Sequence, residues 1–292
     1  MFKPYELFVG LRYTRAKRRN HFISFISLSS MLGIALGVTA LITVLSVMNG
    51  FEKELRERIL GMAAHATIST FGGRLPAWED VAERAAGNRH VLDSAPYVQG
   101  ETMLTHGKQV SGALIRGILP ASEAKVSDVW EHMKFGSIDD LRAGEYGIVL
   151  GSELAYSLGV RKGDPVTVIS PQATVSPAGV LPRLRRFTVT GIFDVGMYEY
   201  DRGVAMMHME DAAKLFSLGD NVTGVRLKLD DMFLAPYIAR EIASSFPGDI
   251  RVEDWTRQHA NFFKAVKTEK RVMFVILTLI VAVAAFNIVS TL

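Results

Sequence analysis

The sequence predicts an α+β membrane protein, in which two transmembrane helices with stalk extensions flank a mixed α+β domain outside the cytoplasm. Two uncharged apolar runs, at residues 22–48 and 272–292 of the 292-residue chain, indicate the two helices, because about 20 apolar residues of helix cross a bilayer. Residues 64–254, between the runs, mix strand-like and helix-like stretches and carry charges throughout. A basic cluster directly before the first run predicts its orientation.

Residues 1–21 precede the first membrane segment and are predicted to stay in the cytoplasm. Four basic residues between Arg15 and Arg19 stand directly before the apolar run, and short flanks rich in Lys and Arg remain on the cytoplasmic side. Residues 4–17 combine an apolar stripe with basic flanks, which is typical of an amphipathic helix. Two uses of this helix stay open, lying along the inner membrane face or packing on a protein partner.

The first apolar run, residues 22–48, is too long for a cleaved signal peptide, whose apolar core has about 7–15 residues. Its small residues allow another helix to approach closely, so we expect a helix bundle; they are Gly33, Ala35, Gly37, Thr39 and Ala40. Helical spacing of apolar residues continues through residues 49–63, with charged residues on the other face. This segment is interpreted as a stalk that continues the first helix.

A second stalk is predicted at residues 255–271, and it leads directly into the second apolar run at residues 272–292. Asn287 within that run is strongly polar and needs a partner inside the lipid, which a neighbouring helix would provide. Because both stalks continue membrane helices, we expect motion of the domain and motion of the spans to be coupled.

Residues 64–254 are predicted to fold as a mixed α+β domain. A short helix ends at Gly159, and strands are expected at residues 65–71, 97–104, 110–118, 165–170 and 185–193. Between the last two strands, residues 171–182 are predicted to be a proline-rich loop, longer than a hairpin turn requires. Because prolines stiffen a chain, this loop is either a pre-organised arm or an ordinary mobile loop, and both interpretations stay open.

The sequence carries no sign of catalysis, of a metal site or of a cofactor. Cysteine is absent, which excludes thiolate ligands, cysteine nucleophiles and disulfides. Motifs for a phosphate-binding loop, a zinc protease or a serine nucleophile are absent too, and the seven histidines lack metal-ligand spacing. The carboxylate pairs Asp139–Asp140 and Asp230–Asp231 are interpreted as turn residues. The net charge of +3 comes from interleaved basic and acidic residues, so we predict neither an enzyme nor a nucleic-acid-binding protein.

Five stretches of the sequence resemble the LolC/LolE family, the lipoprotein-releasing permeases of Gram-negative inner membranes. They are FVGLRYTRAKRRNHFISFIS at residues 8–27, LSVMNGFE at 45–52, GSELA at 151–155, LGVRKGD at 158–164 and VAVAAFNIVS at 281–290. The resemblance extends over essentially the whole chain, and the long N-terminal motif is specific. It implies a MacB-like periplasmic core for the domain. Since the family has four spans, we expect this chain to lack the last two.

The resemblance implies a permease subunit of an ABC complex that extracts lipoproteins and passes them to a LolA-like periplasmic chaperone. The implied partners are a separate LolD-like ATPase, a second LolC/LolE-like permease (the same or a different chain), the chaperone and the lipoprotein. Hook-bearing members, LolC-like or LolF-like, bind the chaperone through a protruding hook and a basic pad. The proline-rich loop stands where that hook would be, and the implied chaperone-binding residues are Pro171, Pro177, Ala178, Gly179, Val180, Pro182, Arg183, Arg185 and Arg186.

An apolar surface at the outer edge of the membrane is expected to hold the acyl chains of the lipoprotein. Two apolar stripes are the candidate walls, and methionine in each adapts to irregular chains. They are Val44, Met48, Phe51 and Leu55 on the first helix, and Phe262, Phe263, Val266 and Met273 on the second. The same spacing also suits a buried interface between helices, and both uses stay open.

Three other functions share this topology. A MacB-like efflux or mechanotransmission permease is disfavoured by the hook-like loop and by the Asn49–Gly50 motif of the stalk. The others are an FtsX-like regulator of cell-wall hydrolases and a plain membrane-anchored interaction module. Capture of a LolA-like chaperone that depends on Pro177 and Gly179 would separate the first interpretation from all three.

Overall fold

The structure, a computed structural model, describes residues 9, 12, 21–62, 64–176, 179–246, 248–258 and 260–291. The chain divides into two compact units, a helical unit (Met1–Glu54 with Asn261–Leu292) and a sheet unit (Leu55–Ala260). The amphipathic helix predicted at residues 4–17 lies outside the described residues, apart from Val9 and Arg12.

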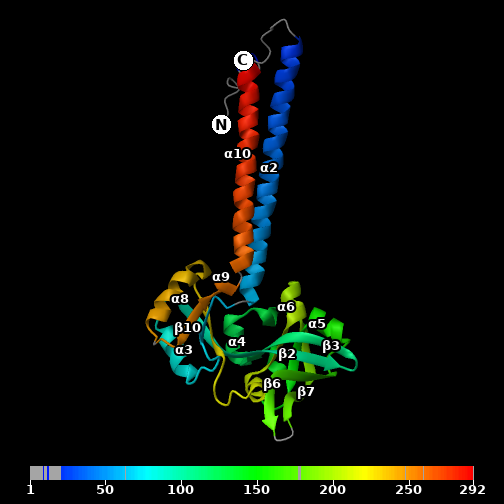
Figure 1. The fold of residues 1–292 in the computed structure, drawn as a ribbon, viewed down its shortest axis with the longest axis vertical. Coiled ribbons are helices and arrows are strands. Elements are labelled where there is room, and N and C mark those ends of the chain that lie inside the picture. The colour runs from blue at the N-terminus through cyan, green and yellow to red at the C-terminus, as the bar shows by residue number, and fades with distance from the viewer. Residues whose placement is uncertain are drawn as a thin grey trace. The chain divides into compact units, whose positions relative to one another are not determined.

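The helical unit contains parts of two long helices, α2 (His21–Met62) and α10 (Ala260–Thr291). Within the unit they run side by side in opposite directions (Figure 1). They approach closely at Gly37, where an added Cβ atom would lie 3.3 Å from Cγ2 of Ile280. A small residue at this position therefore lets the two backbones come together.

One segment among the described residues, Met31–Gly50 of α2, is long and apolar enough to cross a membrane. It lies within the first predicted span and is followed by unbroken helix through the predicted stalk, as far as Met62. The second predicted span, residues 272–292, lies in α10 up to Thr291. Its role as a span stays a prediction.

The described residues of the sheet unit form a ten-stranded sheet. Its strands are β1 (Ala66–Thr70), β2 (Val91–His106), β3 (Gln109–Ile118), β4 (Met133–Phe135), β5 (Gly147–Gly151), β6 (Pro165–Ser176), β7 (Gly179–Phe193), β8 (Val204–His208), β9 (Gly224–Leu229) and β10 (Ile250–Asp254). Neighbouring strands follow the order β10-β1-β9-β2-β3-β8-β5-β7-β4, and β6 pairs with β2 and β7. The mixed α+β fold predicted for this part of the chain is confirmed.

Strand β2 is 16 residues long and joins two different halves of the sheet. Its first half pairs with β9, and its second half pairs with β3. Because β6 pairs with β2 on one side and with β7 on the other, strands β2, β3, β8, β5, β7 and β6 close into a ring. Strands β9, β1 and β10 extend from β2 as an open sheet. Closure leaves the strands of the ring without open edges along their paired lengths.

Short helices cover both halves of the sheet. Helices α3 (Trp78–Ala86) and α8 (Ala235–Ser244) pack on the open half, and α4 (Pro120–Val126) packs on β2 and β9. Helices α5 (Ser152–Leu158), α6 (Tyr198–Gly203) and α7 (Met209–Phe216) pack on the ring. The remaining short helices are η1 (Val129–His132), η2 (Ile138–Asp140), η3 (Met232–Leu234) and α9 (Trp255–Gln258).

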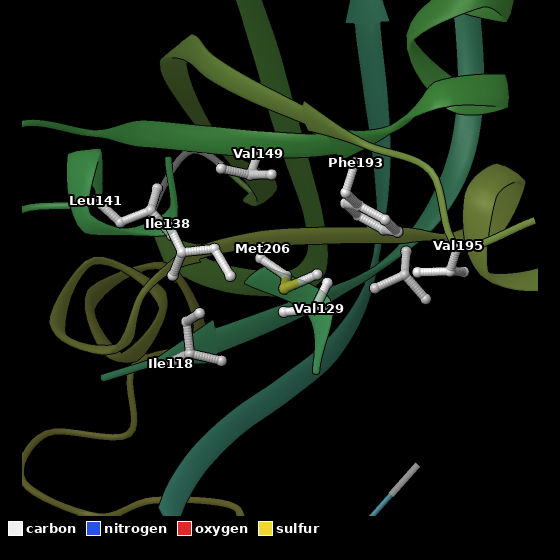
Figure 2. Packing of buried hydrophobic residues seen from close by; sticks show 9 residues of the cluster. Ile118, Val129, Ile138, Leu141, Val149, Phe193, Val195 and Met206 are labelled. Atoms are coloured by element: carbon white, nitrogen blue, oxygen red, sulfur yellow. The ribbon is translucent and has the colours of Figure 1, made fainter. Parts of the chain in front are cut away.

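A buried apolar cluster fixes the ring strands to η1 and η2 (Figure 2). Its members are Ile118, Val129, Ile138, Leu141, Val149, Phe193, Val195, Val204 and Met206. Full burial of one large apolar side chain contributes about 1.5–3 kcal/mol to folding. Phe193 ends β7, so this cluster anchors one end of the strand whose other end leaves the ring.

Candidate functional site

Strands β6 and β7 extend beyond the neighbouring strands as a β-hairpin (Figure 1). Ser176 pairs with Gly179 at the far end, and Ser170 pairs with Arg183 nearer the ring. The prediction of a loop at residues 171–182 is therefore wrong, because every described residue of this segment lies in β6 or β7. Backbone hydrogen bonds between the two strands stabilise a hairpin, so the projecting arm is preformed and does not need a partner to fold.

The positions of two prolines explain this difference. Pro171 and Pro182 lie in the stretch where the ladder is interrupted, between the Ser170–Arg183 pair and the Thr174–Leu181 pair. Proline cannot donate a ladder hydrogen bond and is tolerated where a ladder is irregular. The residues that suggested a loop are thus accommodated within a hairpin.

The tip of the predicted hook is described only in part. Pro177 and Ala178 lie outside the described residues. For Gly179 and Val180 the structure gives the backbone pairing, opposite Ser176 and Val175. Their part in chaperone binding stays a prediction.

The three arginines predicted as one pad lie on two faces of the hairpin. Arg185 is opposite Val168, and Arg186 is opposite Thr167. Successive side chains of a strand point to opposite faces. Arg185 therefore shares the face of buried Val168, and so does Arg183, two residues away, whereas Arg186 lies on the outer face. The prediction grouped these residues because they are close in sequence, and the sequence does not show the strand register.

Arg185 is held at the base of the hairpin by aromatic packing. Its guanidinium carbon lies 5.1 Å from the centre of the Tyr146 ring, a distance at which a cation is attracted to the ring face. Tyr146 in turn meets Phe187 edge to face, with ring centres 5.6 Å apart. Phe187 is fully buried, so Tyr146 links the exposed charge of Arg185 to the core.

The outer face of the hairpin base carries exposed apolar side chains next to a charge. The register aligns Met103 of β2 with Ile169 of β6 and Leu184 of β7. Met103 and Leu184 are 50% and 60% exposed, and a contiguous exposed apolar patch marks an interaction site. Arg186 lies on the same face, opposite Thr167. We call Met103, Ile169, Leu184 and Arg186 the outer row.

Sequence reasoning missed the three apolar members of the outer row. Met103 is 66 positions from Ile169 in the chain, and they meet only because β6 pairs with β2. In the structure, β2 and β6 each have buried and accessible positions, which indicates that one face is left open. A single sequence does not show which two strands pair, so it could not bring these residues together.

All eight residues predicted to contact the lipoprotein lie on α2 or α10, and the structure describes the side chains of three of them. Val44 is exposed on α2, whereas Met48 of α2 and Met273 of α10 are half-buried. The side chains of Phe51, Leu55, Phe262, Phe263 and Val266 lie outside the described ones. Met273 borders a hollow of about 690 Å³ on α10, lined also by Lys264, Ala265, Thr268, Glu269 and Val272.

Many large apolar side chains of α2 and α10 are exposed in the helical unit. On α2 they include Leu32, Leu36, Ile42 and Val47, and on α10 they include Phe274, Leu279, Val283 and Phe286. Exposing an apolar surface of this kind to water is unfavourable, whereas exposing it to the hydrocarbon of a bilayer is favourable. Within the described part of the chain, no group of three or more His, Cys, Asp or Glu side chains is placed to hold a metal ion.

The chain is similar to known proteins along almost its whole length. Residues 27–244 match the model of the MacB-like periplasmic core domain. The chain is 51% identical over 291 residues to the lipoprotein-releasing system transmembrane protein LolC of Xylella fastidiosa, an alignment that covers 100% of this chain and 70% of that protein. It is 47% identical to LolC of Neisseria meningitidis, covering 98% and 69%. It is 31% identical to LolE of Haemophilus influenzae, again covering 98% and 69%.

Proposed function

The chain belongs to the LolC/LolE family of lipoprotein-releasing transmembrane proteins, and from this premise we propose that it extracts lipoproteins from the inner membrane and delivers them to a LolA-like periplasmic chaperone. It is a permease subunit of a lipoprotein-releasing system and a membrane protein with a periplasmic domain. In the proposed topology, α2 and α10 span the Gram-negative inner membrane and residues 64–254 lie in the periplasm.

The observation that carries the proposal is the β6–β7 hairpin with its outer row. The hairpin extends beyond the neighbouring strands, and the outer row combines exposed Met103 and Leu184 with the charge of Arg186. Apolar side chains supply most of the free energy of association, and a charge beside them contributes to orientation and partner choice. We assign chaperone binding to this face of the hairpin and to its tip.

The exposed apolar surfaces of α2 and α10 support the lipoprotein part of the proposal. Transfer of an acyl chain into water costs about 0.8 kcal/mol for each CH₂ group, so a chain of about 16 carbons costs on the order of 12 kcal/mol. A released lipoprotein therefore needs a continuous apolar path. Val44, Met48 and Met273 contribute to that path on the periplasmic side of the membrane in our proposal.

The energy source and the second half of the path lie on other subunits in this proposal. The chain lacks a phosphate-binding loop of its own, so we assign ATP hydrolysis to a separate LolD-like ATPase. A second LolC/LolE-like permease, identical or different, would complete the apolar path between the membrane helices.

Site-specific crosslinking tests the assignment of the hairpin. A photoreactive amino acid in place of Leu184 should crosslink to the purified LolA-like chaperone when the full chain is reconstituted with its ATPase and partner permease. The control position is Tyr237 on α8, which is 68% exposed but lies on the open half of the sheet. Equal crosslinking at both positions, or capture of a cell-wall hydrolase through position 184, would contradict the proposal.

A charge on the apolar path tests the assignment of the helices. Met48→Asp should abolish crosslinking to a lipoprotein while the complex still assembles, because a carboxylate cannot line an acyl-chain path at low cost. Ser46→Asp introduces the same charge two positions away, at an exposed polar side chain on a different face of α2, and should keep the crosslink. Retained crosslinking in Met48→Asp would rule out this path.

A further inference from the structure

A polar pocket of about 530 Å³ lies in the sheet unit, away from the outer row. Strand register places its lining residues on one face of the sheet. Thr67 of β1 is opposite Arg226 of β9, and Gln99 of β2 is opposite Arg116 of β3. The pocket is lined by Ala64, Thr67, Tyr97, Gln99, Leu114, Arg116, Glu199, Tyr200, Gly203, Val204 and Arg226.

The two arginines of the pocket differ in how their charges are balanced. Arg226 is buried and forms an ion pair with buried Glu123 of α4. Nε of Arg116 is shielded from solvent, and no residue that the structure describes offers it a hydrogen-bond acceptor. Removing a cation from water without a partner is costly. The pocket therefore contains a guanidinium group with an unmet need for an acceptor.

The charge state of Arg116 fits this description. Burial, and next the charge of Arg226, lower the pKa of Arg116 to about 10. The side chain is still a cation at neutral pH. Glu199 also lines the pocket, but its side chain is exposed, where water and salt screen its charge. The buried Glu123 carboxylate raises the pKa of Arg116, but it is paired with Arg226 and gives Nε of Arg116 no hydrogen bond. Two guanidinium groups therefore share one buried carboxylate, and one positive charge is left for a further anion.

Several hydrogen-bond donors line the same pocket as Arg116. Burial raises the pKa of the Tyr97 and Tyr200 phenols, so both keep their protons at neutral pH. Thr67 and Gln99 add a hydroxyl and an amide to the lining. A carboxylate offers two acceptor oxygens in one plane, whereas a phosphate group presents its oxygens as a tetrahedron, with four acceptors in free phosphate and two charged plus two ester oxygens in a phosphodiester.

We propose that this pocket binds an oxyanion of the phosphate class, with Arg116 as its main ligand and the Tyr97 and Tyr200 hydroxyls as additional donors. The anion is either inorganic phosphate or the phosphodiester of a phospholipid headgroup, which share a tetrahedral phosphorus and at least two charged oxygens. The inference does not rest on the proposed lipoprotein release, because the pocket shares no residue with the outer row or with the predicted acyl-chain path.

Binding is tested with the full chain purified in detergent and free of phosphate. Titration with inorganic phosphate at constant ionic strength should raise the unfolding temperature, because a ligand that binds only the folded state stabilises it. Parallel titrations use glycerophosphoglycerol, a soluble headgroup mimic, and succinate as the carboxylate. Arg116→Met should weaken phosphate binding at least tenfold. Arg142→Met, the matched change at an exposed arginine, should leave it unchanged.

Each result has a defined meaning. Stabilisation by phosphate or by glycerophosphoglycerol that is lost in Arg116→Met supports the site, and the better ligand identifies the source of the anion. No stabilisation of the wild type beyond that given by chloride, equal stabilisation in Arg116→Met, or succinate binding as tightly as phosphate would overturn it. If Arg116→Met does not fold, Tyr200→Phe removes one donor only and should weaken binding several-fold; unchanged binding would overturn the proposal.

Discussion

The two units of the chain treat large apolar side chains in opposite ways. In the sheet unit, Phe193 is fully buried among the ring strands, η1 and η2 (Figure 2). In the helical unit, Phe274 of α10 is 67% exposed. The same residue type therefore serves a protein core in one unit and an outward surface in the other. Burial in its own core therefore stabilises the sheet unit, and we expect the helical unit to need an apolar surrounding.

Two matched Phe→Ala changes test this comparison with the largest expected effect. Phe193→Ala should lower the free energy of unfolding of the sheet unit by about 3–5 kcal/mol, because it leaves a cavity in a close-packed core. Phe274→Ala should change it by no more than about 0.5 kcal/mol, as expected for an exposed site. Urea unfolding of the full chain in detergent, followed by tryptophan fluorescence, measures both. Similar losses in the two variants would contradict the comparison.

A pair of Leu→Lys changes tests whether lipid surrounds the helical unit. Leu36 is exposed within the apolar segment of α2, and Leu92 is exposed on β2. A lysine at the centre of a membrane helix costs about 3 kcal/mol of insertion free energy. Leu36→Lys should therefore lower the ratio of inserted to uninserted chains in a cell-free membrane-insertion assay by roughly a hundredfold, whereas Leu92→Lys should leave this ratio unchanged. Equal insertion of both variants would mean that α2 does not face lipid.

Two Gly→Ala changes sharpen the comparison, because they should have opposite signs. A Cβ atom at Gly117 of β3 would lie 2.4 Å from Cβ of Ala212 on α7, whereas no described atom lies within 4 Å of a Cβ at Gly33 of α2. Gly117→Ala should therefore cost about 1–3 kcal/mol through overpacking. Gly33→Ala should stabilise its helix by up to about 1 kcal/mol. Thermal unfolding followed by circular dichroism at 222 nm reports both changes, and destabilisation by Gly33→Ala would reveal a packed partner at that face.

Local patterns in the sequence predicted the parts of the fold that depend on local structure. The strands expected at residues 97–104 and 110–118 lie within β2 and β3, because alternation and a turn specify such a hairpin on their own. The apolar run around Met31–Gly50 is helical, as a long unbroken run of apolar residues predicts. Ring closure by β6 and β2 was not predictable, since it joins residues as distant as Met103 and Ile169.

The candidate site shows the same difference between local features, which the sequence predicts, and long-range contacts, which it does not. Arg185 was singled out from the sequence, but its aromatic support, Tyr146, comes from a different part of the chain. The pairing of Arg226 with Glu123 likewise depends on α4 packing over β9. Side chains that meet through strand register or helix docking leave no spacing signal in one sequence. The prolines of the hairpin, in contrast, did give a local signal, and that signal favoured the wrong structure.

Burial in the sheet unit also acts on a polar group, which leads to the smallest expected effect. His65 is half-buried just before β1. Burial lowers the pKa of His65 below its ordinary 6.5, and the Leu229 carbonyl, 3.2 Å from Nδ1, opposes this more weakly. Well above pH 6.5 the ring is neutral in both states. As the pH falls below 6.5, the unfolded chain binds a proton first, so stability is lost until the lower folded pKa is passed.

The variant His65→Gln isolates this contribution, because glutamine is polar and does not titrate. The wild type should lose more of its free energy of unfolding between pH 8 and pH 5 than the variant does, when urea unfolding is measured at both pH values. At pH 8 the imidazole is neutral in both states, so the difference between the two proteins there gives the cost of the lost contacts alone. The same loss in both proteins would mean that burial of His65 does not penalise its charged form. In that case the sheet unit would exclude water from apolar side chains but not from this ring.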